Sequence, residues 1–173
     1  SNQLASLEGC PSSVIILYCD FNRLTTLQGC PASVKILSCE HNQLTSLQGC
    51  PAFVRNLSCE HNQLTSLQGS SASVNTLFCG YNQLTSLDGC PNSLSELVCN
   101  YNQLISLEGL PNSLIELHCH NNHQEINLAF LPLNVRKISH NSEHPDFKDA
   151  SPEEIKDMVN LRIRINKTKS ARN

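Results

Sequence analysis

Residues 34–51 read VKILSCEHNQLTSLQGCP, and most of the chain repeats this stretch. Leu37, Asn42 and Gly49 each have an identical residue 20 positions earlier and another 20 positions later. Written as one template, the repeat is V/L-x-x-L-x-C-x-x-N-x-L-x-x-L-x-G-C-P-x-x. Self-similarity at a fixed period of this length predicts a solenoid, in which each repeat packs only against its neighbours.

The segment before each asparagine alternates between two kinds of side chain, as the first complete repeat illustrates. Leu17 and Cys19 fall on one side of it, whereas Tyr18 and Asp20 fall on the other. This period of two predicts a half-buried β-strand. It ends at Asn22, whose short amide can bond local backbone where the chain turns. The Gly-Cys-Pro sequence marks a second turn. Because a 20-residue repeat has little room for a full α-helix, we expect an extended or 3₁₀-like convex side.

An asparagine recurs after each predicted strand. We expect its side chain to be buried, and a buried amide needs hydrogen-bond partners, which the backbone must supply. Loss of one such amide should leave buried groups unpaired. The sequence therefore predicts a structural ladder formed by Asn22, Asn42, Asn62, Asn82, Asn102 and Asn122.

The ten cysteines form two columns at the repeat period. One slot also accepts serine or leucine, which indicates packing, since free cysteine behaves as a small buried hydrophobe. Neighbouring strands lie about 4.8 Å apart, whereas a disulfide needs a Cβ separation of about 3.8 Å. We therefore expect reduced, buried thiols and a reducing compartment, the cytoplasm. The columns are Cys10, Cys30, Cys50 and Cys90, with Ser70 and Leu110 in the same slot, and Cys19, Cys39, Cys59, Cys79, Cys99 and Cys119.

The template resembles the leucine-rich-repeat family, whose core pattern is L-x-x-L-x-L-x-x-N/C-x-L. Residues 94–104 read LSELVCNYNQL and fit this pattern, with cysteine in the third leucine position. The short repeat with proline at its start resembles the repeats of bacterial effectors, including those followed by a ubiquitin-ligase domain. The NQLTSL phrase also resembles repeats of giant viruses and amoeba-associated microbes. The resemblance covers about residues 1–141 and implies a right-handed horseshoe with a parallel β-sheet on its concave face.

The repeat slips in register near its C-terminal end and then returns. Gln124 stands where leucine is expected, and Pro132 comes 21 residues after Pro111. Residues 132–140 nevertheless fit the template as a degenerate seventh strand. We therefore expect residues 1–141 to form an array of about six 20-residue repeats plus this strand.

The last part of the chain has a different character. Ser151, Pro152 and Glu154 form a helix-start signature, with an N-cap, a proline at the first position and a glutamate after it. We expect residues 142–173 to be a C-terminal cap, with a helix from about 152 and a basic tail. Residues 151–173 carry a net charge of +3, so the remaining 150 residues carry −6.

This charge gives no basic footprint for nucleic acid. No run of eighteen apolar residues occurs, so we expect no membrane span. The motifs of phosphate loops, nucleophile elbows and zinc proteases are not found in the sequence. We therefore expect a protein without enzymatic activity and without a cofactor.

The residues expected on the concave face vary from repeat to repeat, whereas the core slots do not. This is how a recognition surface on a fixed frame appears within one sequence, although relaxed constraint or solvated, stacked edge residues would give the same variation. Aromatic rings would supply apolar contact area, and an acidic row would select a basic partner. The candidate partner-binding residues are Tyr18, Asp20, Phe21, Glu40, His41, Glu60, His61, Phe78, Tyr81 and Tyr101.

Histidines gather near the end of the array. His118 and His120 fall on the same side of a strand, and imidazole is a common zinc ligand. Cys119 points the other way, so these residues cannot complete a tetrahedral site together. A partial site that uses Glu96 or Glu116 is the alternative to the simpler interpretation of polar residues near a cap, and we expect no metal.

The leading hypothesis is a binding module that recognises a protein or peptide on its concave face. One alternative is the substrate-recognition part of a larger ubiquitin-ligase-type effector, which would place the chain in a host-cell cytoplasm. Another is a structural solenoid that self-associates. Residues 1–11 align with residues 81–91, so the chain starts inside a repeat. An open N-terminal strand edge of this kind can pair with another copy.

Overall fold

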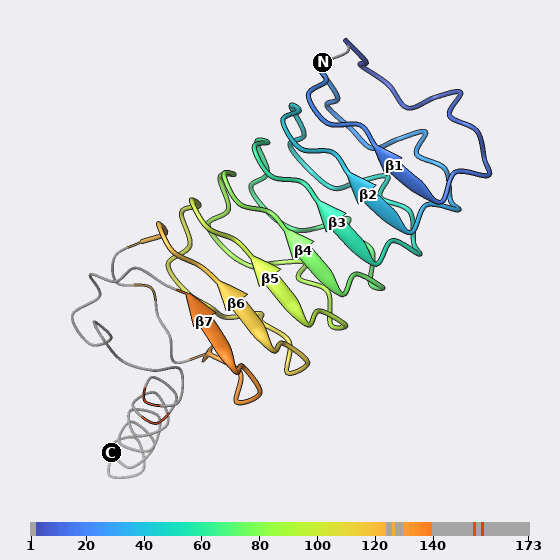
Figure 1. Cartoon of the computed structure of the whole chain (residues 1–173). Helices are drawn as coiled ribbons and strands as arrows, with labels where there is room; N and C mark the ends of the chain where they lie inside the picture. Colours follow the sequence, from blue (N-terminus) through green and yellow to red (C-terminus); the bar gives the residue numbers. More distant parts are fainter. Residues whose placement is uncertain (1–2, 124–125, 127–129, 140–153, 155–156, 158–173) are drawn as a thin grey trace.

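The structure is a computed structural model that describes residues 3–123, 126, 130–139, 154 and 157. Its described part contains a single parallel sheet, and the strands follow one another in chain order (Figure 1). Each strand has three residues: β1 (Ile16–Tyr18), β2 (Ile36–Ser38), β3 (Asn56–Ser58), β4 (Thr76–Phe78), β5 (Glu96–Val98), β6 (Glu116–His118) and β7 (Lys137–Ser139).

The strands pair without a shift in register. From β1 to β6 each strand residue lies opposite the residue 20 positions further on, for example Leu37 opposite Leu57. Between β6 and β7 the offset becomes 21, with Leu117 opposite Ile138. The extra residue is therefore accommodated in the connection between the last two strands, and the sheet continues through it.

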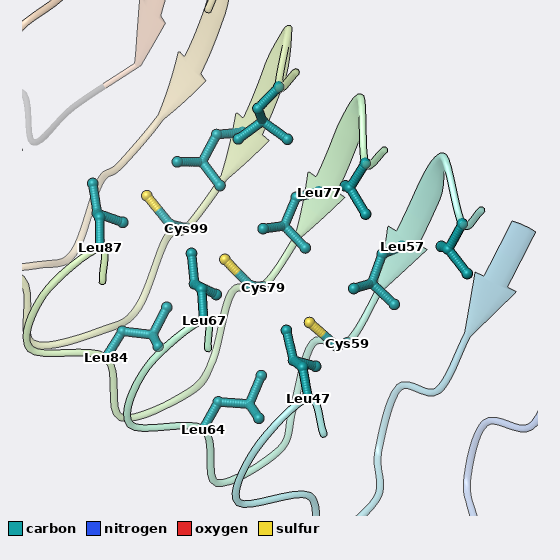
Figure 2. Packing of buried hydrophobic residues seen from close by; sticks show 14 of the residues in the cluster. Leu47, Leu57, Cys59, Leu64, Leu67, Leu77, Cys79, Leu84, Leu87 and Cys99 are labelled. Carbon is teal, nitrogen blue, oxygen red and sulfur yellow. The ribbon is translucent and has the colours of Figure 1, made fainter. Parts of the chain in front are cut away.

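The core is built from the same side chains in successive internal layers (Figure 2). Leu57, Leu64 and Leu67 have no exposed surface, and neither does Cys59 between them. Each buried leucine contributes about 1.5–3 kcal/mol relative to an exposed one. Because the layers stack in one continuous cluster, repeats too small to fold alone stabilise one another.

In the described residues, the connection from each strand to the next consists of turns and extended chain rather than of an α-helix. The expected parallel β-solenoid of leucine-rich-repeat type, with little helix, is thus observed. Of the expected cap, the structure describes only Glu154 and Asp157, which are helical and exposed. The remainder of that segment lies outside the described residues. Among the described residues, no helix has the length and apolar character needed to cross a membrane.

The glycines of the repeats occupy turns with positive φ, a conformation that glycine adopts without strain. Gly49 has a φ of 91°, and the turn closes with a hydrogen bond of 3.0 Å from the Cys50 amide to the Leu47 carbonyl. A Cβ at this position would lie 2.6 Å from the Gln28 amide nitrogen of the preceding repeat. Gly9 has a similar φ of 84°, but nothing lies within 4 Å of its added Cβ.

Each internal asparagine of the ladder bonds two repeats together. The Asn42 amide group donates to the Cys39 and Glu40 carbonyls, both at 3.1 Å, and to the Cys19 carbonyl of the preceding repeat at 3.0 Å. Its carbonyl oxygen accepts the Leu24 amide, also of the preceding repeat, at 2.9 Å. The same four bonds recur at Asn62, Asn82 and Asn102, so one side chain replaces the backbone pairing that is lost where the strand ends.

Gly9 and Gly49 share a positive φ, but only Gly49 lies close to the preceding repeat. Alanine variants of the two can therefore separate the energetic cost of the backbone conformation from that of steric overlap. We expect Gly9→Ala to lower stability by about 1 kcal/mol, the cost of a left-handed backbone for alanine. Gly49→Ala should cost about 1–3 kcal/mol more, because its Cβ also overlaps backbone atoms. Urea unfolding of the two variants would measure the difference, and equal costs would contradict the close approach between repeats.

Replacing a ladder asparagine should destabilise the array without changing its surface. Asn62→Ala removes the partner of the buried Leu44 amide, which costs about 1–3 kcal/mol for the unpaired group. The matched control is Gln63→Ala, because this neighbouring side chain is exposed. Thermal unfolding followed by circular dichroism should show a clear decrease for Asn62→Ala only. The same melting temperature in both variants would disprove the structural role of the ladder.

Candidate partner-binding surface

The strand side chains that point away from the core differ widely between repeats. Tyr18 of β1 is 71% exposed, whereas Phe78, in the same slot of β4, is only partly exposed. Ser38 and Ser58 occupy this slot on the two strands between them. Tyr18 and Phe78 are therefore three strand spacings apart, about 14 Å. The structure places both predicted residues on the outward sheet face but does not bring them into one cluster.

The acidic row follows the ends of β1, β2 and β3. The Asp20 carboxylate accepts hydrogen bonds from the Ser38 hydroxyl at 2.6 Å and from the Glu40 amide at 2.8 Å. Partial burial, then the charges of Glu60 and Asp20, raise the pKa of Glu40 above its ordinary value. Burial likewise raises the pKa of Glu60. A nearby cation would therefore offset the burial of Glu40 and Glu60 and the repulsion that Glu40 experiences from its acidic neighbours.

An aromatic residue occupies the next position in each of five successive repeats, and these residues form a continuous ring column. Their rings lie 4.1–4.2 Å apart between centroids and are tilted by only 9–12° to one another. At the end of the column, His120 meets Tyr101 edge-on at 5.4 Å. Offset-stacked rings gain energy beyond their buried area. The ring column consists of Phe21, His41, His61, Tyr81 and Tyr101.

The backbone beneath the ring column has a left-handed conformation, which the sequence analysis did not predict. The five residues have φ values between 50° and 55°, and Asn121 continues the slot with 53°. Each amide remains bonded to the next repeat, for example Phe21 to the Glu40 carbonyl at 2.9 Å. The ring column therefore lies at the turn after each strand, at the edge of the outward sheet face. Asn121 was the available signal, because asparagine is enriched at positive φ.

His118 and His120, the two candidate metal ligands, contact different neighbours. His118 Nε2 lies 2.7 Å from Glu116 Oε1, and the same oxygen accepts Lys137 Nζ at 2.5 Å. Lys137 and then His118 lower the pKa of Glu116. His120 instead packs against Tyr101. Among the described residues, no group of three histidine, cysteine or acidic side chains is arranged to hold a metal ion.

The cysteines of the core slot provide no exposed nucleophile. Burial, followed by the charge of Asp20, raises the pKa of Cys19 to about 12. Cys119 is also buried, and its pKa is about 12 for the same first reason. A reactive thiol needs a depressed pKa and access. All ten cysteines are free thiols.

A basic groove that the repeat pattern does not reveal lies at the opposite end of the strands. Lys35 and Arg55 directly precede β2 and β3, and they line an open groove of about 480 Å³ together with Phe53, Ser73 and Asn75. The signal that could have revealed it is Phe53. Serine occupies the corresponding slot in most other repeats.

The pKa of His61 should depend on the charges of its neighbours in the surface. Burial first, and then the charge of His41, lowers the pKa of His61, whereas Glu40 raises it. In His41→Asn the like charge is absent, so the pKa of His61 should rise towards 6.5. In Glu40→Gln a favourable negative charge is absent, so it should fall further. Histidine-resolved NMR titration measures both shifts, and shifts of the opposite sign would contradict the arrangement of these rings.

Comparison with known proteins gives matches among solved structures. No family model and no curated protein matches the chain. The chain is similar to YopM from Yersinia enterocolitica WA-314, with a TM-score of 0.69 and 29% identity over 80% of this chain and 31% of that one. It is also similar to YopM, a leucine-rich effector protein from Yersinia pestis, with a TM-score of 0.64 and 26% identity over 80% of this chain and 41% of that one.

The matched region thus spans less than half the length of either YopM chain. It nevertheless includes most of the repeat array, whose strands stack in sequence order. The matches confirm the expected resemblance to bacterial-effector repeats. The chain forms a parallel β-solenoid of about 20-residue repeats that is structurally similar to the leucine-rich repeats of the Yersinia effector YopM.

Proposed function

We propose that the chain is a non-enzymatic binding module that recognises a protein or peptide partner. The partner contacts the outward sheet face and the ring column at its edge. The observation that carries this proposal is the ring column itself. It presents Phe21 at 55% exposure and Tyr81 and Tyr101 at 43% each, on a rigid frame. Exposed aromatic area of this kind is what binding interfaces bury at their centres.

The acidic row gives the proposed surface its selectivity. Glu40 and Glu60 lie beside His41 and His61 of the ring column and are only partly exposed. The raised pKa values of Glu40 and Glu60 mean that their partial burial disfavours the charged carboxylates. A lysine or arginine of a partner would reduce this cost and pack its stem on the rings. We therefore infer a partner with a basic, solvent-exposed segment.

The similarity to YopM supports an effector-like role, because one of the matched proteins is described as a leucine-rich effector. Free thiols in all ten positions favour a reducing compartment, so we place the chain in the cytoplasm, including that of a host cell. The resemblance implies that the outward sheet face is the concave one. A concave surface can surround a convex epitope, as solenoid proteins commonly do.

A capture experiment tests the proposed surface. The variant Glu60→Lys with His61→Asn reverses one charge and removes one ring, while Asn121 shows that asparagine fits this left-handed slot. The control is Asp88→Lys, which makes the same change in charge at an exposed position outside the ring column. Proteins captured from eukaryotic cell lysate are identified by mass spectrometry. We expect a partner that the parent and the control retain, and whose recovery falls at least tenfold with the ring-column variant.

Three results would speak against this function. Equal capture by both variants would exclude the ring column and acidic row as the contact surface. Equal loss from both variants would indicate a nonspecific response to charge. If no partner is captured and light scattering shows concentration-dependent assembly of the parent, the chain is a self-associating solenoid instead.

A further inference from the structure

The groove beside β2, β3 and β4 combines charge with exposed apolar surface. Lys35 and Arg55 occupy the same slot in successive repeats, so their backbone positions lie one strand spacing apart, about 4.8 Å. Phe53 is 66% exposed. The volume of about 480 Å³ lies within the usual range for ligand sites. The groove can therefore offer two cations and an aromatic ring to the same ligand.

Phe53 interrupts a second ladder that otherwise connects the repeats. The Ser33 hydroxyl bonds the Ser12 and Val14 carbonyls of the preceding repeat at 2.7 and 2.6 Å. Ser93 and Ser113 make the corresponding pairs of bonds. A phenylalanine has no hydroxyl and cannot make these bonds. The chain therefore gives up a recurring structural contact at the position where it exposes a large ring.

The next repeat also departs from the template at the groove. Ser71 replaces the proline of the other repeats, and its hydroxyl bonds the Ala52 carbonyl at 2.6 Å. Two repeats of this kind can be compared: in the following one, the Ser93 hydroxyl donates the corresponding bond to the Ala72 carbonyl. Ser71 thus donates to the Ala52 carbonyl, which by analogy with Ser93 would be the acceptor of the Ser73 hydroxyl. Ser73 lies exposed in the lining of the groove, where its hydroxyl is available to a ligand.

The charges favour a protein segment over a nucleic acid as the occupant. Lysine and arginine attract anionic groups, and arginine can bind a carboxylate through two parallel hydrogen bonds. The chain has a net charge of −3, and the acidic row lies on the same strands, beyond their other ends. Lys35 and Glu40 are five residues apart, about 16 Å in extended chain. A polyanionic strand extending along this sheet would meet that acidic row, whereas a short acidic peptide segment would not.

We propose that this basic groove binds an acidic segment of a protein partner, with carboxylates on Lys35 and Arg55 and an aromatic side chain on Phe53. The inference deepens the proposed protein-binding function and rests on it. The proposal also predicts which end of the bound segment is acidic and which is basic. A segment that lies along β2 and β3 would place acidic residues in the groove and basic residues, about five positions away, beside Glu40 and Glu60.

The proposal is tested with a defined probe in an NMR titration of the ¹⁵N-labelled chain. The probe is the peptide GSEDFDGS, and its neutral counterpart is GSQNFNGS. We expect GSEDFDGS to shift the amide signals of Arg55, Ser73 and Asn75, and to bind at least tenfold more tightly than the neutral peptide. Lys35→Gln with Arg55→Gln should weaken its binding at least tenfold.

Two further variants make the test specific. Phe53→Ser restores the serine found at position 33, so the array should fold while peptide affinity falls. Arg136→Gln removes an exposed cation from the same slot before β7, outside the groove, and should leave peptide binding unchanged. Equal binding of the two peptides, or equal affinity in the parent and the groove variants, would overturn the proposal. Tighter binding of a ten-nucleotide single-stranded RNA at the same signals would overturn the choice of a protein segment.

The two proposals fail in different ways. Loss of partner capture by the ring-column variant, with no binding of GSEDFDGS, would reject the groove and keep the proposed function. Specific binding of GSEDFDGS without partner capture would keep the groove and reject the ring column as a protein-binding surface.

Discussion

The backbone hydrogen bonds of the ladder asparagines are the constraint on which the rest of the structure depends. A three-residue strand can pair through few backbone groups, and the chain then turns away from the sheet. Asn62 bonds backbone groups of its own repeat and of the preceding one, which sets the distance and register between repeats at that turn. Every side chain before or after it therefore meets its counterpart in the next layer.

This fixed register explains how the ring column tolerates an unfavourable backbone. A non-glycine residue in a left-handed conformation costs about 1–2 kcal/mol, and the chain adopts it at Phe21, His41, His61, Tyr81 and Tyr101. The asparagine that follows each ring holds the turn, and stacking at 4.1–4.2 Å returns part of the cost. The rings are thus already stacked before a partner binds, which reduces the side-chain entropy lost on binding.

Periodicity alone predicts most of the fold. The spacing of leucines identifies the core, the alternation around Leu17 locates β1, and the recurring asparagine identifies the ladder. The left-handed turn could not be predicted in the same way, because aromatic side chains at that slot suggest strand rather than turn. The sequence pattern assigns the ring residues to the sheet face, whereas they lie at its edge. The basic groove was missed because it arises from deviations such as Phe53, which a repeat template averages out.

Those deviations are concentrated in adjacent repeats, and their placement bears on function. Phe53 interrupts the row of serine hydroxyls that bond the preceding repeat, and Ser71 replaces a proline. Among the buried side-chain oxygens that the structure describes, the Ser70 hydroxyl lacks a partner. A solenoid can tolerate such losses, because stability is a sum over layers and intact neighbours on both sides hold the altered repeat in place. The middle of the array is therefore where structural residues can be exchanged for binding residues at the least risk to the fold.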